Sequence, residues 1–326
     1  MSYKIADATD IPRFAEGTVL TGRFSKRAYR VTCLIGIGAN GAVYLVTDDE
    51  KQRYALKVSA QASALAVECD RLRTMADISR ELHVSPDVVE LDDVYFAHAY
   101  WPVLVMTYID GEALDEWIKT KANLQQFPIV LEQLVTMLER LHDAGLAYCD
   151  IKPSNFLIEK TSGRLTMIDF GGVTVIGQAV KEFTEPFDRA WWGFGSRKAD
   201  VHYDLFAVCM LAVHLLRPIP KHDLKRLATA HPRERRAYVA NQMSMPGPHL
   251  DLLDRLSFVL TNDCTSRDVL RMLQAYLRST QRTVPSYALA GSTRKSRRRW
   301  DSTDYGLLAA VIVFASSLVG ILVVSR

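Results

Sequence analysis

The chain has 326 residues, of which 48% are hydrophobic and 24% charged, so it is long enough to bury a large core and too apolar to be intrinsically disordered. The net charge is only +3, but residues 281–304 hold six basic and two acidic groups, whereas residues 1–280 carry −2. The five cysteines are scattered without a Cys-x-x-Cys pair, which argues against a disulfide framework or a zinc site and indicates reduced thiols.

The first part of the chain predicts a small antiparallel sheet with one helix. Apolar residues alternate from Tyr29 to Ile35, as in a half-buried strand, whereas residues 1–17 show no clear period and are expected to form a leader. Apolar residues between Leu65 and Ala76 repeat at helical spacing. The expected strands cover 29–35, 42–46 and 53–58, with further strand-like runs around Asp92–Asp93 and at 103–106.

After residue 111 the apolar pattern becomes mainly helical, interrupted by a loop and two short strands. The first long helix is amphipathic, and a later one is apolar on all sides, as in a helix buried within a core. In chain order, the expected elements are a helix at 127–141, a loop at 149–155, strands at 156–158 and 165–168, a helix at 204–216 and further helices to about Thr280.

The C-terminal region predicts a membrane anchor. Residues 305–325 form an uncharged apolar run of 21 residues, which as a helix spans roughly the ~30 Å hydrocarbon core of a bilayer. The basic residues lie just before this run and only Arg326 follows it, so the positive-inside rule places residues 1–304 in the cytoplasm. The N-terminus lacks the apolar run of a signal peptide, and we therefore expect a single-pass protein of the cell membrane.

A Gly-x-Gly-x-x-Gly pattern at Gly36, Gly38 and Gly41 lies between two expected strands. In a dinucleotide-binding fold this pattern opens a helix, whereas between two strands it can bend over phosphate groups. Lys57 on the next expected strand can pair with the α- and β-phosphates of a nucleotide, provided that a carboxylate holds it. Glu68 on the following helix is the candidate, and Glu81 is the alternative.

Two later motifs carry the groups that phosphoryl transfer requires. Such a reaction needs a carboxylate that accepts the proton of the attacking hydroxyl, a cation near the γ-phosphate and oxygen ligands for metal ions. Asp150, Lys152 and Asn155 fit these roles in Asp-Ile-Lys-Pro-Ser-Asn. Asp169, in Asp-Phe-Gly after an expected strand, fits that of a Mg²⁺ ligand.

In this order, the motifs resemble the signature set of protein kinases over roughly residues 29–275. The resemblance implies an α+β bilobal fold that uses ATP with Mg²⁺, or with Mn²⁺. The Lys152-Pro153 pair is typical of serine/threonine kinases rather than tyrosine kinases. The implied organisation is a leader at 1–17, a sheet-rich N-lobe at 18–109, a mainly helical C-lobe at 110–280, a basic linker at 281–304 and a transmembrane helix at 305–325.

The same resemblance assigns the residues around the nucleotide. Met106 is the expected gatekeeper at the back of the pocket, and the hinge follows it. Asp204 matches the aspartate that anchors the catalytic loop from a central helix. The expected ATP-binding set is Ile35, Gly36, Gly38, Asn40, Gly41, Val43, Ala55, Lys57, Glu68, Met106, Thr107 and Ile109.

The sequence departs from the family pattern at two places. Tyr148-Cys149-Asp150 stands where the family has His-Arg-Asp, and no Ala-Pro-Glu motif is present. Without that arginine, a phosphorylated activation loop lacks its usual cation, so we hypothesise that activity does not depend on loop phosphorylation. Thr174 and Thr184 are candidate autophosphorylation sites, but each is also consistent with an ordinary loop hydroxyl, above all Thr184, which lies where the family contacts substrate.

The divergent stretch from Thr184 to Val208 resembles the short membrane-anchored serine/threonine kinases of spore-forming bacteria, the YabT type, which suggests a link to sporulation. The basic linker and the single expected C-terminal helix agree with this resemblance, which covers nearly the whole chain. The basic linker has two interpretations that do not exclude each other. It can contact anionic lipid beside the anchor, or it can bind DNA, as the resemblance implies, with Trp300 stacking on an unpaired base. The cations concerned are Arg294, Lys295, Arg297, Arg298 and Arg299.

The implied activity is phosphorylation of serine and threonine hydroxyls in cytoplasmic proteins and, through self-association, in the kinase itself. One alternative is a membrane-tethered pseudokinase scaffold, which the two motif departures favour slightly. The intact Lys57, Asp150, Asn155 and Asp169 argue against it, because a scaffold has no need of all four. Another alternative is a small-molecule phosphotransferase of related fold, which the glycine-rich hairpin makes less favoured.

Overall fold

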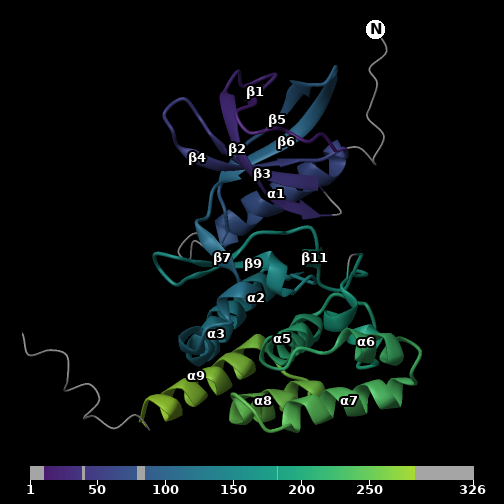
Figure 1. Ribbon diagram of the computed structural model, residues 1–326. Coiled ribbons are helices and arrows are strands. Elements are labelled where there is room, and N and C mark those ends of the chain that lie inside the picture. The colour runs from purple at the N-terminus through teal and green to yellow at the C-terminus, as the bar shows by residue number, and fades with distance from the viewer. Residues whose placement is uncertain (1–10, 39–40, 79–84, 182, 283–326) are drawn as a thin grey trace, which may run out of the picture. The chain divides into compact units, whose positions relative to one another are not determined.

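The computed structural model of the chain describes residues 11–38, 41–78, 85–181 and 183–282 (Figure 1). The basic linker cations and the apolar run at 305–325 lie outside these residues. No helix within the described part of the chain is both long and apolar enough to cross a membrane. The described chain forms two lobes, a sheet-rich one above a helical one (Figure 1), as the sequence predicted.

The upper lobe is an antiparallel sheet of six strands in the order β1-β2-β3-β4-β6-β5, with one long helix, α1, packed against β5 and β6. Its apolar residues, among them Tyr44, Leu56 and Val103, form a core of their own. The elements are β1 (Val19–Thr21), β2 (Ala28–Gly38), β3 (Gly41–Thr47), β4 (Arg53–Val58), α1 (Ala62–Ile78), β5 (Val88–Phe96) and β6 (Ala99–Thr107).

Two expectations for this lobe were wrong. The alternating burial predicted for 29–35 ends after Val31, since the pairing of β2 with β3 shifts register at Val31/Cys33 and again at Leu34/Gly36. Cys33 and Ile35 are therefore exposed. Residues 11–17, expected in a leader, pack against the sheet: Phe14 is buried, and its backbone N–H donates to the Tyr44 hydroxyl.

Helix α1 presents one buried stripe, and that stripe contains a charge. Leu65, Cys69, Leu72 and Met75 repeat at helical spacing and are buried. Glu68 lies on the same face and is only 5% exposed. A buried carboxylate is costly unless it is paired, so this glutamate needs a cation from the sheet.

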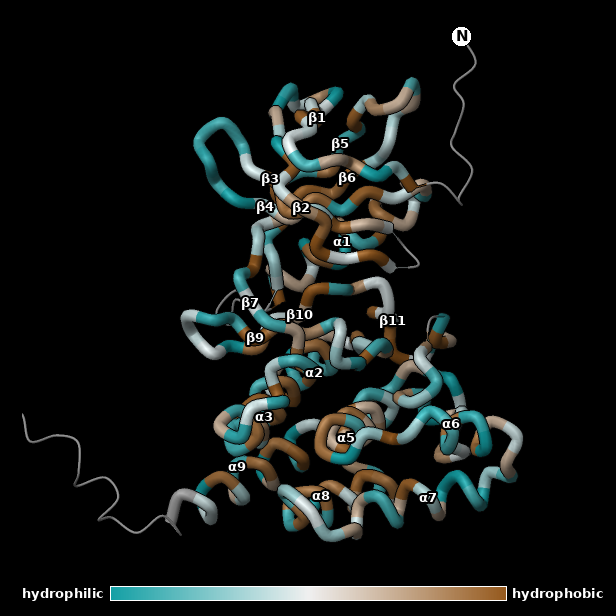
Figure 2. The backbone as a smooth tube through the Cα atoms, viewed as in Figure 1, coloured by the Kyte–Doolittle hydropathy of each residue, from teal (hydrophilic) through white to brown (hydrophobic). Residues whose placement is uncertain are grey.

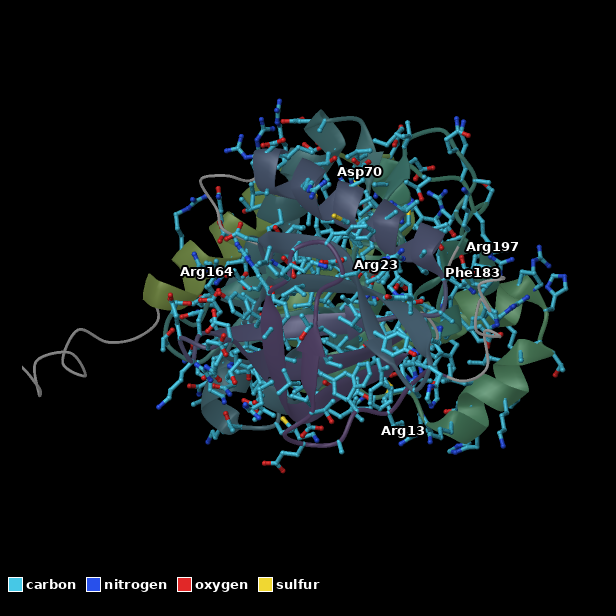
Figure 3. All side chains as sticks on the ribbon, turned by 90° about the horizontal axis from the view of Figure 1, so that it is seen from above. Arg13, Arg23, Asp70, Arg164, Phe183 and Arg197 are labelled. Atoms are coloured by element: carbon cyan, nitrogen blue, oxygen red, sulfur yellow. The ribbon has the colours of Figure 1, made fainter. Side chains whose placement is uncertain are left out.

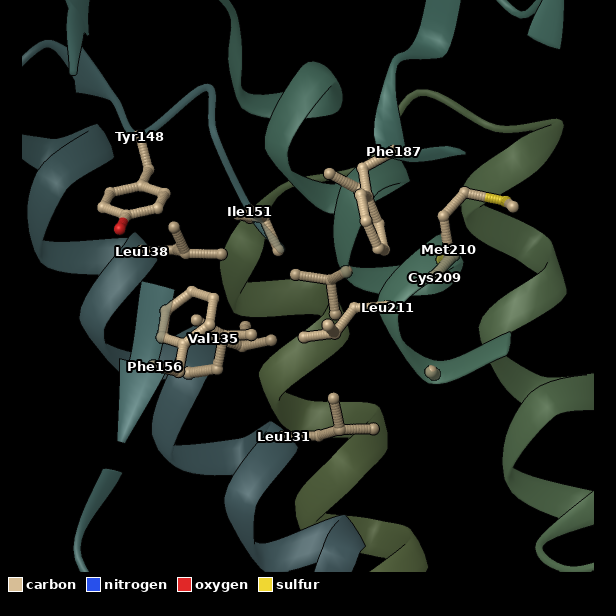
Figure 4. Close-up of a cluster of buried hydrophobic side chains, with 14 of the residues drawn as sticks. Leu131, Val135, Leu138, Tyr148, Ile151, Phe156, Phe187, Cys209, Met210 and Leu211 are labelled. Atoms are coloured by element: carbon tan, nitrogen blue, oxygen red, sulfur yellow. The ribbon is translucent and has the colours of Figure 1, made fainter. Parts of the chain in front are cut away.

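The lower lobe is built around two helices, α3 and α5, whose apolar side chains meet in its core. Figure 4 shows Leu131, Val135 and Leu138 of α3 facing Leu211 of α5. Figure 2 shows α5 as a largely hydrophobic helix, in keeping with its nearly complete burial. The helices are α2 (Leu114–Trp117), α3 (Lys121–Asp143), α4 (Arg189–Trp192), α5 (Val201–Leu216), α6 (Lys221–Ala228), α7 (Pro232–Ser244), α8 (Leu250–Leu256) and α9 (Ser266–Arg282).

Short strands at the top of the lower lobe frame its loops. One small sheet has the order β10-β9-β7, and β8 pairs with β11. The loop between β8 and β9 contains Asp150, and the loop between β10 and β11 contains Asp169. Figure 1 shows β9 and β11 at the edge of the lower lobe nearest the upper lobe. The strands are β7 (Gly111–Ala113), β8 (Leu146–Ala147), β9 (Phe156–Glu159), β10 (Leu165–Met167) and β11 (Thr174–Val175).

Candidate active site

Lys57 of β4 and Glu68 of α1 form a buried ion pair. The Lys57 Nζ lies 2.7 Å from Oε1 and 2.6 Å from Oε2 of Glu68, and the two residues are 7% and 5% exposed. Lys57 lies in the interior of the sheet, opposite Val43 of β3 and Leu104 of β6. Only 11 positions separate Lys57 from Glu68 in the sequence, and they can still pair because α1 begins soon after β4 ends. The alternative carboxylate, Glu81, lies outside the described residues.

Two glycines of the Gly-x-Gly-x-x-Gly pattern, Gly38 and Gly41, lie at the facing ends of β2 and β3. Gly41 has φ +146°, and a Cβ there would lie 2.3 Å from the Val58 carbonyl oxygen, so only glycine fits this close approach. At Gly38 a Cβ would meet no atom within 4 Å, so packing does not demand glycine there. Asn40 lies outside the described residues.

The other expected nucleotide contacts lie on the strands around this turn. Val43 of β3 pairs with Gly36 of β2, and Ala55 of β4 pairs with Met106 of β6. Met106 is 5% exposed and belongs to the lower-lobe core. Thr107 ends β6, and Ile35 and Ile109 are in β2 and in the segment after β6. The described residues of the expected ATP-binding set therefore lie on the sheet and on the segment that connects the two lobes.

The catalytic-loop residues converge on one carboxylate. The Lys152 Nζ lies 2.6 Å from Asp150 Oδ2, and the Asn155 Nδ2 donates to the same oxygen and to the Asp150 carbonyl, each at 2.8 Å. The second carboxylate oxygen, Oδ1, lies 3.4 Å from the Thr184 hydroxyl. Asp150 and Asn155 are 8% and 3% exposed, so their side chains are held within packed surroundings.

A buried aspartate of α5 holds the backbone of this loop. Asp204 is completely buried and accepts hydrogen bonds from the backbone N–H groups of Tyr148 at 2.7 Å and Cys149 at 2.8 Å. The His142 Nε2 lies 2.9 Å from the same carboxylate. These contacts hold Cys149 at φ +63°, a conformation uncommon for a side-chain-bearing residue, and so set the position of Asp150 that follows.

Asp169 lies next to the catalytic loop. The buried Tyr148 hydroxyl donates to the Asp169 carbonyl, and burial raises the pKa of this phenol, so it stays protonated as a donor. The Gly171 N–H donates to Asp169 Oδ1 at 2.9 Å. A Cβ at Gly172 would lie 2.6 Å from the Asp150 Cβ, so this glycine allows the two loops to touch. Asp150 and Asp169 are thereby brought together.

The oxygen atoms of Asp169 and Asn155 fit the ligands of a magnesium ion that is shared with a nucleotide. No group of three or more histidine, cysteine or acidic side chains that could hold a metal occurs among the described residues. Mg²⁺ is commonly held by one or two protein oxygens together with substrate phosphates. Asp169 offers a carboxylate, and Asn155, whose Nδ2 points at Asp150, offers its amide oxygen. When bound, the ion neutralises charge on the phosphates.

Two contributors, Arg71 and Gly172, were missed by the sequence analysis. Arg71 of α1 donates from Nη1 to the carbonyls of Phe170, at 3.1 Å, and of Gly171. Gly172 permits the contact between loops, and its signal was the second glycine after Phe170. Thr184 was expected where the family contacts substrate, and its hydroxyl lies 3.4 Å from the catalytic carboxylate of Asp150. No local pattern marks Arg71, because its partners are about 100 positions away.

The chain matches the model of the protein kinase domain over residues 29–282 and therefore belongs to that family. Serine/threonine-protein kinase YabT of Bacillus subtilis (strain 168) is 31% identical over 288 residues, covering 87% of this chain and 82% of its own. Serine/threonine-protein kinase PrkC of the same organism is 26% identical over 203 residues, which is 56% of this chain and 30% of PrkC.

The solved structure of vaccinia related kinase 3 has the same fold, with a TM-score of 0.61 at 14% identity, and the match covers 84% of this chain and 94% of that one. With the family match and the relatives, this fold defines the class of enzyme. The chain is a bilobal protein kinase of the serine/threonine type, similar to the bacterial kinases named above.

The buried pair gives a first prediction. In Glu68→Gln, the Lys57 ammonium loses its counter-charge while remaining buried, and breaking a buried pair in this way typically costs ~3–5 kcal/mol. We expect nucleotide affinity, measured by titration calorimetry, to fall at least tenfold. Glu116→Gln is the matched control, because its pair with Lys119 is solvent-exposed and such pairs contribute little to stability. Equal behaviour of the two variants would contradict a positioning role for Glu68.

Proposed function

We propose that this kinase transfers the γ-phosphate of ATP to serine and threonine hydroxyls of cytoplasmic proteins and of a second copy of itself, from a catalytic domain tethered to the cell membrane. The observation that carries the catalytic part is an unbroken path of contacts. Lys57 pairs with Glu68, and α1 continues to Arg71, which holds the loop of Asp169. Tyr148 then joins Asp169 to Asp150.

The residues support an in-line transfer. Asp150 Oδ1 orients the incoming hydroxyl and accepts its proton as the new O–P bond forms and the bond to the ADP oxygen breaks. Lys152, 2.6 Å from the other carboxylate oxygen, lies where it can offset charge on the γ-phosphoryl group. Lys57 holds the α- and β-phosphates, and Asn155 and Asp169 are the metal ligands. Each of these side chains is positioned by a hydrogen bond or an ion pair with another residue.

The surroundings of Thr184 border the place of the acceptor hydroxyl. Its hydroxyl lies near Asp150 Oδ1, so residues 183–185 border the place where an acceptor must enter. Phe183 is 42% exposed, and the Arg197 guanidinium lies 3.7 Å from its ring centroid (Figure 3). Arg197 in turn pairs with buried Asp188, which caps α4. This wall is ordered by contacts within the protein, so we assign Thr184 to the acceptor side of the site rather than to autophosphorylation.

Asp150→Asn tests the catalytic assignment. The amide keeps the shape of the side chain but cannot accept the hydroxyl proton, so we expect turnover to fall by about 10²–10⁴-fold while ATP affinity stays within twofold. Turnover is measured with labelled ATP and myelin basic protein, and binding by calorimetry. Ser154→Ala, at an exposed position of the same loop, is the control. Unchanged autophosphorylation in Asp150→Asn would refute the role of Asp150.

The same assay separates the enzyme from the pseudokinase alternative. A scaffold would bind nucleotide with equal affinity in wild type and Asp150→Asn and would turn over in neither. The observed contacts favour the enzyme, because an inactive scaffold would not need Lys152 and Asn155 directed at the same carboxylate oxygen.

We extend the proposal to the activation segment, which we infer does not need a phosphate to stay in place. Where the family has an arginine, Cys149 lies 3% exposed in an apolar socket with Val180, Ala199 and Tyr203. The segment is also held by backbone hydrogen bonds, from Gly177 to Ala199 at 2.8 Å and back from Ala199 to Gln178 at 2.8 Å. Burial raises the pKa of the Cys149 thiol, so it stays neutral within the socket.

Accordingly, Thr174→Ala should retain activity within about threefold of wild type, because the Thr174 hydroxyl makes only contacts that the socket can lose, a hydrogen bond to the Gly172 carbonyl and one with the Cys149 thiol, among those described. Val180→Asp places a charge in the socket and should greatly reduce activity. Iodoacetamide labelling at pH 8, read by mass spectrometry, reports on the segment: in wild type exposed Cys33 reacts and Cys149 does not, whereas Val180→Asp should expose Cys149. Complete loss of activity in Thr174→Ala would contradict this inference.

Tethering and control by the linker remain part of the proposal and rest on the sequence, since residues 283–326 lie outside the described part. Deleting 305–325 should move the kinase from the membrane to the soluble fraction.

Changing Arg297, Arg298 and Arg299 together to alanine should make the negative slope of log affinity for DNA against log salt shallower by about 2–3. Anionic vesicles replace DNA in a parallel arm, and autokinase rate is measured in both. An unchanged slope would eliminate DNA binding by these three cations.

A further inference from the structure

Arg71 joins the helix that holds the nucleotide lysine to the loop that holds the metal ligand. It lies three residues after Glu68 on α1, and its Nη1 donates to the backbone carbonyls of Phe170 and Gly171, the former at 3.1 Å. Hydrogen bonds from a charged donor are stronger than neutral ones. Phe170 itself is completely buried, so the backbone at these carbonyls has little freedom to follow a displaced partner.

The Asp169 loop is thus held from two sides. From the lower lobe, the Tyr148 hydroxyl binds the Asp169 carbonyl, and the ring of Tyr148 meets the Phe170 ring edge-on, with centroids 6.1 Å apart. From the upper lobe, Arg71 binds the next two carbonyls along the chain. Asp169 lies one and two residues before these carbonyls, so the direction of its carboxylate depends on both attachments.

We propose that Arg71 is a positioning residue that sets the Asp169 carboxylate for the divalent cation, so that metal affinity depends on the placement of α1. The inference deepens the proposed function and rests on it for the identity of Asp169 as the ligand. It differs from the role of Glu68, since Glu68 acts on the nucleotide through Lys57 and Arg71 acts on the metal through the loop. Loss of Arg71 should therefore weaken metal binding selectively.

The surroundings of Arg71 make an unusually direct test available. Arg71 lines a cavity of about 410 Å³ between α1 and the activation segment, which Asp70, Thr74 and Lys181 also line. Figure 3 shows Asp70 on this helix, seen from above. Truncating Arg71 to alanine adds the volume of its side chain to that cavity. A small guanidinium ion could then enter and restore donors to the two carbonyls.

The experiment measures metal binding without turnover. Mn²⁺ is titrated into the full chain with a non-hydrolysable ATP analogue, and free Mn²⁺ is followed by electron paramagnetic resonance. We expect Arg71→Ala to weaken Mn²⁺ binding at least tenfold, while affinity for the analogue in EDTA stays within twofold. Arg73→Ala, an exposed arginine two positions along the same helix, should match wild type. Methylguanidinium at millimolar concentration should restore part of the Mn²⁺ affinity in Arg71→Ala and change nothing in Arg73→Ala.

Two results would overturn the proposal. One is unchanged Mn²⁺ affinity in Arg71→Ala, and the other is an equal loss of analogue affinity in EDTA, which would mean that Arg71 only fastens α1 and thereby Lys57. If Arg71→Ala does not fold, Arg71→Lys keeps a cation but loses the planar donor fork and should show a smaller loss of Mn²⁺ affinity. Because no step requires phosphoryl transfer, a wild-type chain without turnover would refute the proposed function and still leave Arg71 testable.

Discussion

The buried carboxylate of Asp204 is the constraint on which the active site depends. It lies within α5, the most apolar helix of the lower lobe. Burying a charge there would be costly if the charge had no partners. Its partners are two successive backbone N–H groups and His142. The hydrogen bonds that satisfy the buried charge therefore also fix the shape of the loop. Asp150 follows directly in the chain, and the Tyr148 hydroxyl holds the Asp169 carbonyl by a hydrogen bond. The catalytic geometry is therefore built outward from the core.

Helix α1 is the second support, and it belongs to the other lobe. Its buried stripe contains Glu68, and Arg71 lies one turn further on. One controls the nucleotide lysine, and the other contacts the loop of the metal ligand. A displacement of α1 would disturb both together, because a helix moves as a rigid element. Such a design makes the site sensitive to anything that binds α1, while the lower lobe keeps its own order through Asp204.

Much of this site could be predicted from sequence because its motifs are local and occur in a fixed order. Lys57, Asp150 and Asp169 each lie in a short signature, and the hydrophobic periods marked the elements that carry them. Prediction failed where long-range contacts decide: the bulges of β2 expose Cys33, and the bonds of Arg71 join residues about 100 positions apart. The candidate linker and anchor depend on composition alone, and the described residues do not reach them.

The socket around Cys149 bears on how such an enzyme could be controlled. A cation–phosphate clamp can be made and broken by modification, because its energy depends on an added charge. Burial of Val180 and Ala199 around a neutral thiol does not depend on any charge, and the backbone ladder beside it reinforces the same arrangement. This arrangement is the reason for proposing that the activation segment does not need a phosphate. Under the proposed function, control would act at α1 or through the concentration of kinase and substrate on a shared surface, which a basic linker beside a membrane would supply.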